Sequence, residues 1–460
     1  MPCGSCTNVL SRRTLLGGLA ASQVPVTQAQ PAAKPNVIVI LFDDLGLNDL
    51  GYLGARDLRT PHIDRLAAGG TVCRNWYSNA PVCSPARAAL MTGRNPIRAG
   101  VPNNGPALRP SERTIASIVK DSGYATALTG KWHLGNTPET VPNAAGFDYF
   151  YGFLDGCVDY YSHRYYWGEP KRVNYHDLWR NRTEVFDDGK YLTERIGQEA
   201  ANFISAPRRQ PFFLYTAFNA VHYPMHAPQK YLDRFPGLPP ERRMYAAMLA
   251  AADDMVGSML SALERAGKRE QTLIFLLGDN GATTERRAGL GQNIATAGKN
   301  TPFRGYKFST FDGGMHVPAL VNWPRQIPAG KTIDQVVMTA DILPTLCHLT
   351  GARPPDDRTI DGRNIWPVLT QGAASPHEFV AWALGPQLAI RKGKWKLVLN
   401  GIVHDGTPTG EKPLEGEDAV FLSDLAQDVG ESRNLRRQHP EIVDELQTLL
   451  QKWRRDSEAN

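Results

Sequence analysis

The chain has 460 residues, of which 42% are hydrophobic and 21% are charged, so it can bury one large core and a smaller one. Its 51 basic and 46 acidic residues leave a formal net charge of +5, which is weak for this length. The basic side chains occur as scattered pairs rather than long runs, so a nucleic-acid-binding protein is not expected.

The N-terminus carries the pattern of an export signal. Arg12 and Arg13 precede a short apolar run at residues 15–21, and small residues near Ala29 offer a cleavage site. The apolar run is too short to span a bilayer, so no stable membrane insertion is expected. We expect residues 1–35 to be a signal peptide and linker, recognised by the twin-arginine translocase. The protein would then be periplasmic or secreted; a frayed amphipathic helix is the alternative.

A continuous run of β-branched and apolar residues at 36–42 predicts a central strand of a parallel sheet, covered on both faces. This strand is followed by two adjacent carboxylates, Asp43 and Asp44. A helix is expected next, at residues 60–69, because Pro61 fits its first turn and glycines follow its last one.

Another helix is expected directly after Cys83. Ser84 and Pro85 fit a helix start, because proline at the first position loses only an N–H that has no intrahelical partner. Residues 86–91 are good helix formers. Cys83 would therefore lie at a helix N-terminus, which favours an anion, either a thiolate or a bound oxyanion ester. Arg87, one turn further on, would point back to the same place.

Strands and helices continue to alternate along the chain. The expected helices are at residues 112–122, 191–205 and 242–266, and the expected strands are at residues 124–129, 211–218 and 271–278. This alternation predicts an α/β protein with a large mixed, mainly parallel sheet sandwiched by helices. Polar residues follow the strands, and ligands of such sheets bind beyond the carboxyl ends of the strands. A single active site is therefore expected at that edge.

Beyond residue 353 the pattern changes. Short strands are expected within residues 379–400 and at 420–425, and an apolar stripe at helical spacing follows over residues 441–454. This pattern predicts a small antiparallel sheet with a closing helix. We therefore expect a catalytic α/β domain at 36–353 and a smaller C-terminal α+β subdomain at 354–460.

Two pairs of oxygen donors follow two of the strands: Asp43 with Asp44, and Asp279 with Asn280. Three carboxylates close together would repel one another unless a cation lay among them; Ca²⁺ is the natural choice and Mg²⁺ the second. Either pair alone is weak evidence, because paired acids after a strand often cap the next helix. No set of histidines accompanies them, which argues against zinc.

Residues 83–87 read Cys-Ser-Pro-Ala-Arg and match the pattern Cys-x-Pro-x-Arg, and residues 90–96 are similar to its usual continuation. On these motifs the chain resembles the type I, formylglycine-dependent sulfatases, which are arylsulfatase-like members of the alkaline phosphatase-like superfamily. The resemblance implies that a formylglycine-generating enzyme oxidises Cys83, that the hydrated aldehyde is the nucleophile, and that Arg87 steadies it. It also implies that one Ca²⁺ is held by Asp43, Asp44, Cys83, Asp279 and Asn280. Without the motif, a buried inert cysteine would be the ordinary interpretation.

The remaining site residues rest on the same resemblance. Lys131 and His133 lie in a Gly-Lys-Trp-His-Leu-Gly segment, and two positions apart in an extended segment they can project the same way. Lys131 would hold a sulfate oxygen, and Lys307 would be the second sulfate-binding lysine. His133 would handle the protons of the nucleophile, and His222 would protonate or stabilise the leaving alkoxide. The residue before this second histidine is not the proline that the family commonly has, so His226 is a rival for its role.

The resemblance implies hydrolysis of sulfate monoesters to an alcohol and inorganic sulfate through a sulfated-enzyme intermediate. One alternative is a phosphonate or phosphate ester hydrolase of the same architecture. Another is a non-catalytic binder of sulfated glycans, if Cys83 is never oxidised. The substrate stays open between aryl and carbohydrate sulfates: an aromatic and basic loop at residues 159–167 could stack a sugar or an aryl ring, or be an ordinary packed loop.

Overall fold

The computed structural model describes Met1, Gly4 and residues 34–166, 174–286, 295, 297–403 and 412–459. Lys34–Asn460 form one compact unit, and Met1–Ala33 form a second unit. The predicted twin-arginine signal, with its arginine pair and cleavage site, lies outside the described residues and stays a prediction. The last residue of the aromatic loop expected at 159–167 also lies outside them.

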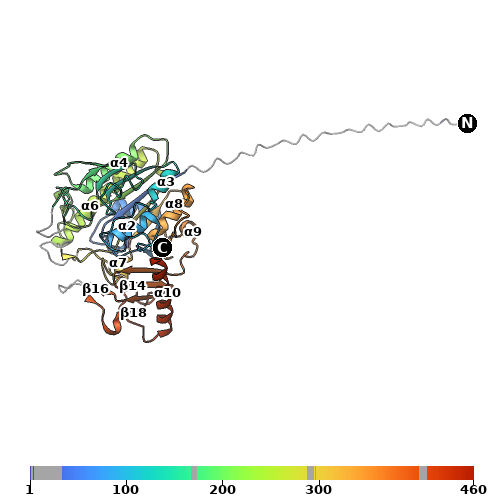
Figure 1. Ribbon diagram of the computed structural model, residues 1–460. Coiled ribbons are helices and arrows are strands. Elements are labelled where there is room, and N and C mark those ends of the chain that lie inside the picture. Colours follow the sequence, from blue (N-terminus) through green and yellow to red (C-terminus); the bar gives the residue numbers. More distant parts are fainter. Residues whose placement is uncertain are drawn as a thin grey trace. The chain divides into compact units, whose positions relative to one another are not determined.

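A large sheet forms the centre of the larger unit, with helices around it (Figure 1). Its ten strands have the order β11-β2-β10-β9-β1-β8-β4-β5-β6-β7. The neighbouring strands β9, β1, β8, β4 and β5 all run parallel. β1 (Asn36–Phe42) is buried along its whole length, as expected of a strand covered on both faces. The other strands of this sheet are β2 (Thr71–Cys73), β4 (Ala125–Lys131), β5 (Tyr149–Phe153), β6 (Trp179–Arg180), β7 (Thr183–Glu184), β8 (Phe212–Ala217), β9 (Thr272–Gly278), β10 (Ala319–Asn322) and β11 (Lys331–Ile333).

Helices cover both faces of the sheet, because the strands carry apolar side chains on both. Along β1, Ile38 and Ile40 pack into one core with α1, α4 and α6, whereas Val37 and Val39 pack into another with α2, α3, α8 and α9. The predicted α/β class is therefore confirmed. The helices of this part are α1 (Pro61–Ala68), α2 (Cys83–Thr92), α3 (Ile115–Asp121), α4 (Leu192–Ser205), α5 (Gln229–Leu232), α6 (Pro240–Arg265), α7 (Asp312–Met315), α8 (Ile342–Thr350) and α9 (Trp366–Gln371).

The C-terminal part contains the predicted antiparallel sheet and its closing helix. The sheet has the order β13-β14-β15-β18, formed by β13 (Val380–Leu384), β14 (Gln387–Lys392), β15 (Trp395–Leu399) and β18 (Val420–Asp424). One face packs on α10 (Pro440–Glu458), and the other face packs on Tyr77, Phe311 and Met315. The two-stranded sheets are β3 (Trp76–Tyr77) with β12 (Val337–Met338), and β16 (Ile402–Val403) with β17 (Lys412–Pro413). The domain boundary at residue 354 stays a prediction.

The helix α6 is long and apolar enough to cross a membrane by length and composition alone. However, 78% of its most apolar window is buried inside the protein. Its apolar side chains pack with those of α4 and of β1 in one core. The apolar character of α6 is therefore explained by its position under the sheet.

Candidate active site

The carboxyl ends of neighbouring parallel strands bring the predicted polar residues together. Phe42 at the end of β1 pairs with Gly278 at the end of β9, so the residues that follow these two strands are neighbours. The backbone N–H of Asp44 donates to Asp279 Oδ1 at 3.1 Å, although the two residues are 235 positions apart. The two predicted donor pairs therefore form one cluster.

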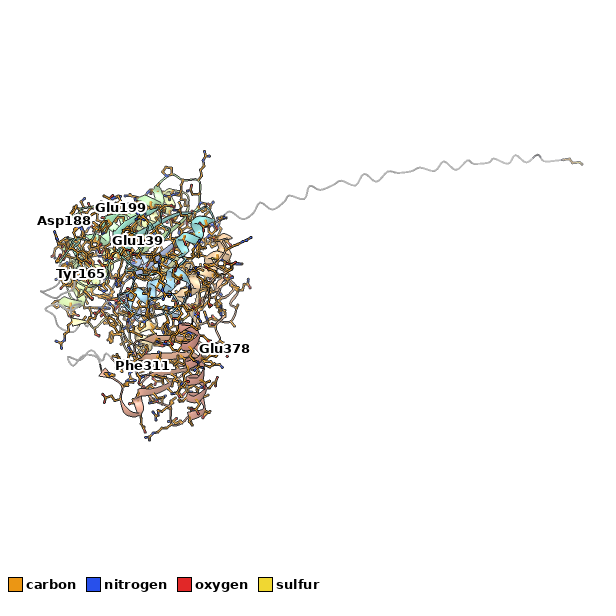
Figure 2. All side chains as sticks on the ribbon, viewed as in Figure 1. Glu139, Tyr165, Asp188, Glu199, Phe311 and Glu378 are labelled. Atoms are coloured by element: carbon orange, nitrogen blue, oxygen red, sulfur yellow. The ribbon has the colours of Figure 1, made fainter. Side chains whose placement is uncertain are left out.

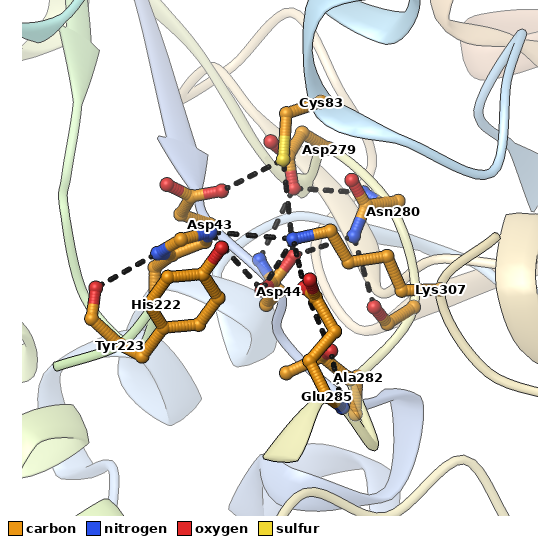
Figure 3. Close-up of polar contacts among 12 residues, drawn as sticks. Asp43, Asp44, Cys83, His222, Tyr223, Asp279, Asn280, Ala282, Glu285 and Lys307 are labelled. Atoms are coloured by element: carbon orange, nitrogen blue, oxygen red, sulfur yellow. Dashed lines mark hydrogen bonds and ion pairs between the residues drawn. The ribbon is translucent and has the colours of Figure 1, made fainter. Parts of the chain in front are cut away.

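Arg87 and Asn280 hold this cluster of carboxylates together. Arg87 Nη2 lies 2.7 Å from Asp279 Oδ2 and 3.3 Å from Asp43 Oδ1, and all three side chains are buried. Asn280 Nδ2 donates to Asp44 Oδ1 at 2.7 Å (Figure 3). The buried Oδ1 of the same amide has no hydrogen-bond partner within the described ranges, so it is free to accept a ligand.

Burial and local charge move the pKa values of the three carboxylates in different directions. Burial raises the pKa of Asp44 to about 7 against the opposing charge of Lys307, and the other two carboxylates add to the rise. Burial also raises the pKa of Asp279. At Asp43 the positive charges, led by Lys131, outweigh burial and hold the pKa well below its usual range. A bound cation would keep all three carboxylates ionised, because opposite charge favours the charged form.

Cys83 is the first residue of α2 and is only 1% exposed. Its Sγ lies 3.5 Å from Asp43 Oδ1 and 3.9 Å from Asp44 Oδ1. The helix begins one residue earlier than expected, and Cys83 lies at its N-terminus as predicted. Burial raises the pKa of the Cys83 thiol well above its usual value, so an unmodified Cys83 is a protonated, weakly nucleophilic thiol at neutral pH.

Two buried lysines reach the same cluster from different segments. Lys131 Nζ lies 2.7 Å from Asp43 Oδ2. Lys307 Nζ lies 3.0 Å from Asp44 Oδ2 and 3.1 Å from Glu285 Oε2 (Figure 3). Burial lowers the pKa of Lys307, but the adjacent carboxylates, led by Asp44, hold it well above its usual value. The site therefore places fixed positive charge beside Cys83.

His222 is buried next to Lys307, with a tautomer that its neighbours determine. His222 Nδ1 lies 2.9 Å from the carbonyl oxygen of Tyr223, which can only accept, so Nδ1 carries the proton. Nε2 then accepts from Lys307 Nζ at 3.2 Å. Burial lowers the pKa of His222 well below its usual value, so this imidazole is neutral at pH 7.

His133 reaches the site by a different backbone route from the one expected. β4 continues through Lys131, and His133 then has a φ of +58°, in the left-handed region. Its N–H donates to the carbonyl oxygen of Leu154 at 2.9 Å, because the chain turns after β4 to follow the end of β5. The expectation that Lys131 and His133 share one extended segment is therefore wrong. Burial lowers the pKa of His133 well below its usual value, with Lys131 adding to the effect.

His226, the rival of His222, lies outside the site in the part of the chain that the structure describes. Its Nδ1 lies 3.3 Å from Asp159 Oδ2, and its side chain is 39% exposed. His133 and His222 line the cavity over Cys83, whereas His226 is not among the described residues that line it.

The cavity over Cys83 has a volume of about 390 Å³. Its polar lining side chains include Asn104, Asn136, Asp155 and Glu285, and its aromatic ones include Tyr165, Tyr223 and Phe308. Tyr165 belongs to the aromatic loop for which substrate stacking was one of two interpretations, whereas the others were not singled out from the sequence. Glu285 could have been considered from the sequence, because it follows Asp279 by only six positions. Asn104 and Asp155 lie in loops, where no sequence motif indicates a role. Asn104 Oδ1 accepts from the backbone N–H of Ser84 at 3.0 Å, at the start of α2.

A sequence model of the sulfatase family matches residues 35–352. The chain belongs to the sulfatase family. The sulfatase is 33% identical to the N-acetylgalactosamine-6-sulfatase of Mus musculus over 82% of its own chain and 74% of that protein. It is 31% identical to the steryl-sulfatase of Mus musculus over 93% of its chain and 83% of that protein. The predicted resemblance is confirmed.

A solved structure similar to this sulfatase is that of Ps i-CgsB in complex with k-i-k-neocarrahexaose. The two chains are 32% identical, with a TM-score of 0.79 over 91% of this chain and 92% of the other. Together with its family and relatives, this likeness shows that the sulfatase is a sulfuric ester hydrolase.

The donor set of the sulfatase fits a metal ion. Ligand atoms of Asp43, Asp44, Cys83 and His222 all lie within 4.8 Å of one another. The unpartnered Oδ1 of Asn280 adds a further oxygen donor beside them. The oxygen donors of this set, the carboxylates and the amide, suit a hard divalent cation such as Ca²⁺ or Mg²⁺, whereas the sulfur of Cys83 and the nitrogen of His222 are softer donors.

Proposed function

We propose that this sulfatase hydrolyses sulfate monoesters of carbohydrates with a formylglycine formed from Cys83. The observation that carries the proposal is the position of Cys83 itself. It lies at the start of α2 with Sγ 3.5 Å from Asp43, close to two buried lysines, and it faces a cavity. Because its thiol has a raised pKa, the unmodified side chain is poorly suited to attack, and oxidation to a hydrated aldehyde would supply a better nucleophile.

Sulfate binding is assigned to the residues around Cys83. Lys131 and Lys307 would neutralise the sulfate oxygens, and Arg87 would hold the nucleophile in place through its position beside Asp43 and Asp279. A Ca²⁺ held by Asp43, Asp44, Asp279, Asn280 and the modified Cys83 would supply further positive charge to the sulfate group. Mg²⁺ is the second choice for this ion.

The proposed reaction has two steps. One hydroxyl of the formylglycine hydrate would attack sulfur and give its proton to Asp43, whose Oδ1 lies 3.5 Å from Cys83 Sγ. The bond from sulfur to the ester oxygen would break, and the alkoxide would take a proton from His222. His133 then removes the proton of the second hydroxyl, the bond from carbon to the sulfate oxygen breaks, and inorganic sulfate and the aldehyde form. Water hydrates the aldehyde again. A serine or a thiol could form the ester but could not release sulfate in this way.

The acid role of His222 requires a proton at Nε2. In the substrate-free arrangement this nitrogen accepts from Lys307 Nζ, 3.2 Å away. A bound sulfate ester would bring negative charge to the imidazole, which raises its pKa and favours the imidazolium. His222 could then donate from Nε2 while Nδ1 stays bound to the carbonyl oxygen of Tyr223.

The lining of the cavity supports a carbohydrate substrate. Carboxylates and amides such as Asp155, Glu285 and Asn104 can bind sugar hydroxyls, and Tyr165 and Tyr223 offer aromatic surface for a sugar ring. One of the relatives is a sulfatase of N-acetylgalactosamine, and Ps i-CgsB was solved with an oligosaccharide. A steroid or simple aryl sulfate has fewer hydroxyl groups and would form fewer hydrogen bonds with these side chains.

Comparative kinetics test the proposed function. We expect kcat/KM to be at least about tenfold higher for nitrophenyl sulfate than for phenyl phosphonate, because the site is built for a sulfate monoester. Among natural esters, a sulfated sugar should exceed a steroid sulfate. A preference for the phosphonate would overturn the sulfatase assignment in favour of its phosphonate hydrolase alternative, and a preference for the steroid would overturn the carbohydrate assignment alone.

A leaving-group series separates the roles of the two histidines. His222→Ala should slow the release of poor leaving groups by about 10²–10⁴-fold and that of stable anions much less, because a stable anion needs little protonation. His133→Ala should instead give one burst of alcohol and then little turnover, with the sulfated protein visible by intact mass. His226→Ala is the control and should behave like the parent. Equal losses across the series for His222→Ala would remove it from the acid role, and a loss confined to poor leaving groups in His226→Ala would give that role to His226.

We also propose that the protein is exported by the twin-arginine translocase after a formylglycine-generating enzyme has modified it. The arginine pair at Arg12 and Arg13, ahead of a short apolar run, supports this proposal. The destination would be the periplasm or the medium. Fractionation of the native host would check it, since cytoplasmic accumulation of the mature enzyme would exclude export.

A further inference from the structure

Lys307 lies in a turn between β9 and α7, where no regular element holds it. The next residue, Phe308, has a φ of +72°, a left-handed conformation that bulky residues rarely adopt. Such a conformation persists only where the surroundings hold it in place. The position of the Lys307 ammonium therefore depends on the contacts of this turn.

The turn is held from three segments by hydrogen bonds. The N–H of Lys307 donates to the carbonyl oxygen of Ala282 at 2.9 Å, and the N–H of Phe308 donates to that of Pro81 at 2.7 Å. The carbonyl oxygen of Phe308 accepts from Nε2 of Gln387 at 2.7 Å. Ala282 follows the Asp279 pair and Pro81 precedes Cys83, whereas Gln387 is the first residue of β14 in the C-terminal sheet.

Gln387 is itself held in one orientation. Its Oε1 accepts from the N–H of Thr310 at 3.2 Å and from the N–H of Ile402 at 2.9 Å. The side chain is 1% exposed, so lost hydrogen bonds would not be replaced by bulk water. This place needs a side chain with a donor toward Phe308 and an acceptor toward the other two groups, and the amide of Gln387 supplies both at any pH.

Packing joins the same turn to the C-terminal sheet. Phe311, four residues after Lys307, lies where the sheet meets the rest of the unit (Figure 2). It packs in one apolar cluster with Trp382, Ala389 and Val398 of that sheet. The sheet therefore contacts the turn through both apolar and polar groups.

We propose that Gln387 is a positioning residue for Lys307, so that the C-terminal sheet takes part in sulfate binding by the catalytic site. The role of Lys307 in binding sulfate belongs to the proposed function, on which this inference rests. Gln387 acts through the carbonyl of Phe308: it holds the left-handed turn, and the turn sets the place of the Lys307 ammonium between Asp44 and Glu285. Gln387 does not line the cavity in the described part of the protein.

Two substitutions test the hydrogen bond. Gln387→Met fills similar space without a donor or an acceptor, and Gln387→Glu replaces the donor with a carboxylate that faces the carbonyl oxygen of Phe308. Both should lower kcat/KM on nitrophenyl sulfate and weaken the binding of inorganic sulfate by about tenfold or more, because small misplacements of a binding group are costly. Asn434→Asp is the matched control: Asn434 also bridges backbone groups in the C-terminal part, at Leu422 and Val420, and its loss should leave both quantities near those of the parent.

The pH dependence of the activity of Gln387→Glu distinguishes a positioning role from a general loss of stability. Within the described residues, the side chain of Gln387 contacts backbone groups and the hydroxyl of Thr310, none of which titrates near neutral pH. The introduced carboxyl regains a donor when it is protonated, so the activity of this variant relative to the parent should rise as the pH falls. Gln387→Met should show no such rise.

A double-mutant cycle with Lys307→Ala completes the test. If Gln387 acts through Lys307, then Gln387→Met should have little further effect once the lysine is gone. Parental sulfate binding in folded Gln387→Met, or full additivity with Lys307→Ala, would overturn the proposal. If Gln387→Glu does not fold, as judged by thermal melting, Gln387→Met carries the test. Sulfate binding can be measured without turnover. A parent protein without activity would therefore count against the proposed function, while the effect of Gln387 on sulfate binding could still be measured.

Discussion

Cys83→Ala should lower sulfate ester turnover by roughly 10⁴-fold or more while the protein keeps its fold. The loss follows because the side chain at this place supplies the attacking atom, and the neighbouring residues bind sulfate but cannot replace the nucleophile. In active parent protein, the Cys83 peptide should have lost one sulfur and two hydrogen atoms and gained one oxygen atom. Intact-mass and peptide mass spectrometry, combined with kcat, measure both expectations.

Cys73→Ala is the matched control for this substitution. Cys73 is also buried, at 2% exposure, but it ends β2 and does not line the cavity in the described part of the chain. Its loss should leave turnover near the parental value. Fully active protein with only unmodified Cys83 would end the formylglycine proposal. Retained glycan binding without any turnover, in protein purified from the native host, would favour the non-catalytic binder.

Removal of the divalent cation should abolish most activity and also lower the melting temperature. The physical reason for the second effect is that Asp43, Asp44 and Asp279 lie together in a buried cluster, where their charges repel unless a cation offsets them. Elemental analysis should find about one calcium per chain. Chelation followed by the return of Ca²⁺ should restore both activity and melting temperature, with Mg²⁺ less effective.

Asn280→Ala should weaken cation binding, because it removes the amide oxygen that has no other partner among the described residues. Asn322→Ala is the control: Asn322 is equally buried and ends β10, where its amide binds the carbonyl oxygen of Leu66. Calcium titration by calorimetry separates the two variants. Equal affinity for Ca²⁺ in Asn280→Ala and the parent would remove Asn280 from the ligand set.

The local elements were predictable because their causes are local. The buried run at residues 36–42 became β1, and a helix begins at Cys83, one residue earlier than expected, with Pro85 in its first turn. Hydrophobic periodicity also located α4, α6 and β9 within about two residues of their bounds. The motif around Cys83 was sufficient for the family, since its residues are consecutive in the chain.

The geometry of the site was decided by tertiary structure. The order β9-β1-β8-β4 places Asp279 beside Asp44, and no local pattern states which strands pair. The left-handed backbone of His133 arises because the chain turns to follow β5. The sequence motif, interpreted as one extended segment, could not predict this turn. Glu285 comes within 3.1 Å of Lys307 only when the loop after β9 folds back.

The sequence by itself therefore determined the fold class, the family and the types of side chain that meet at the strand ends, because propensity, periodicity and consecutive motifs act over a few residues. Only the tertiary structure decided which side chains touch. The contact of Gln387 with the turn of Lys307 joins residues 79 positions apart through a carbonyl group, and backbone groups carry no sequence signal. Contacts of that kind depend on how the C-terminal sheet packs against the rest of the unit, which no local pattern specifies.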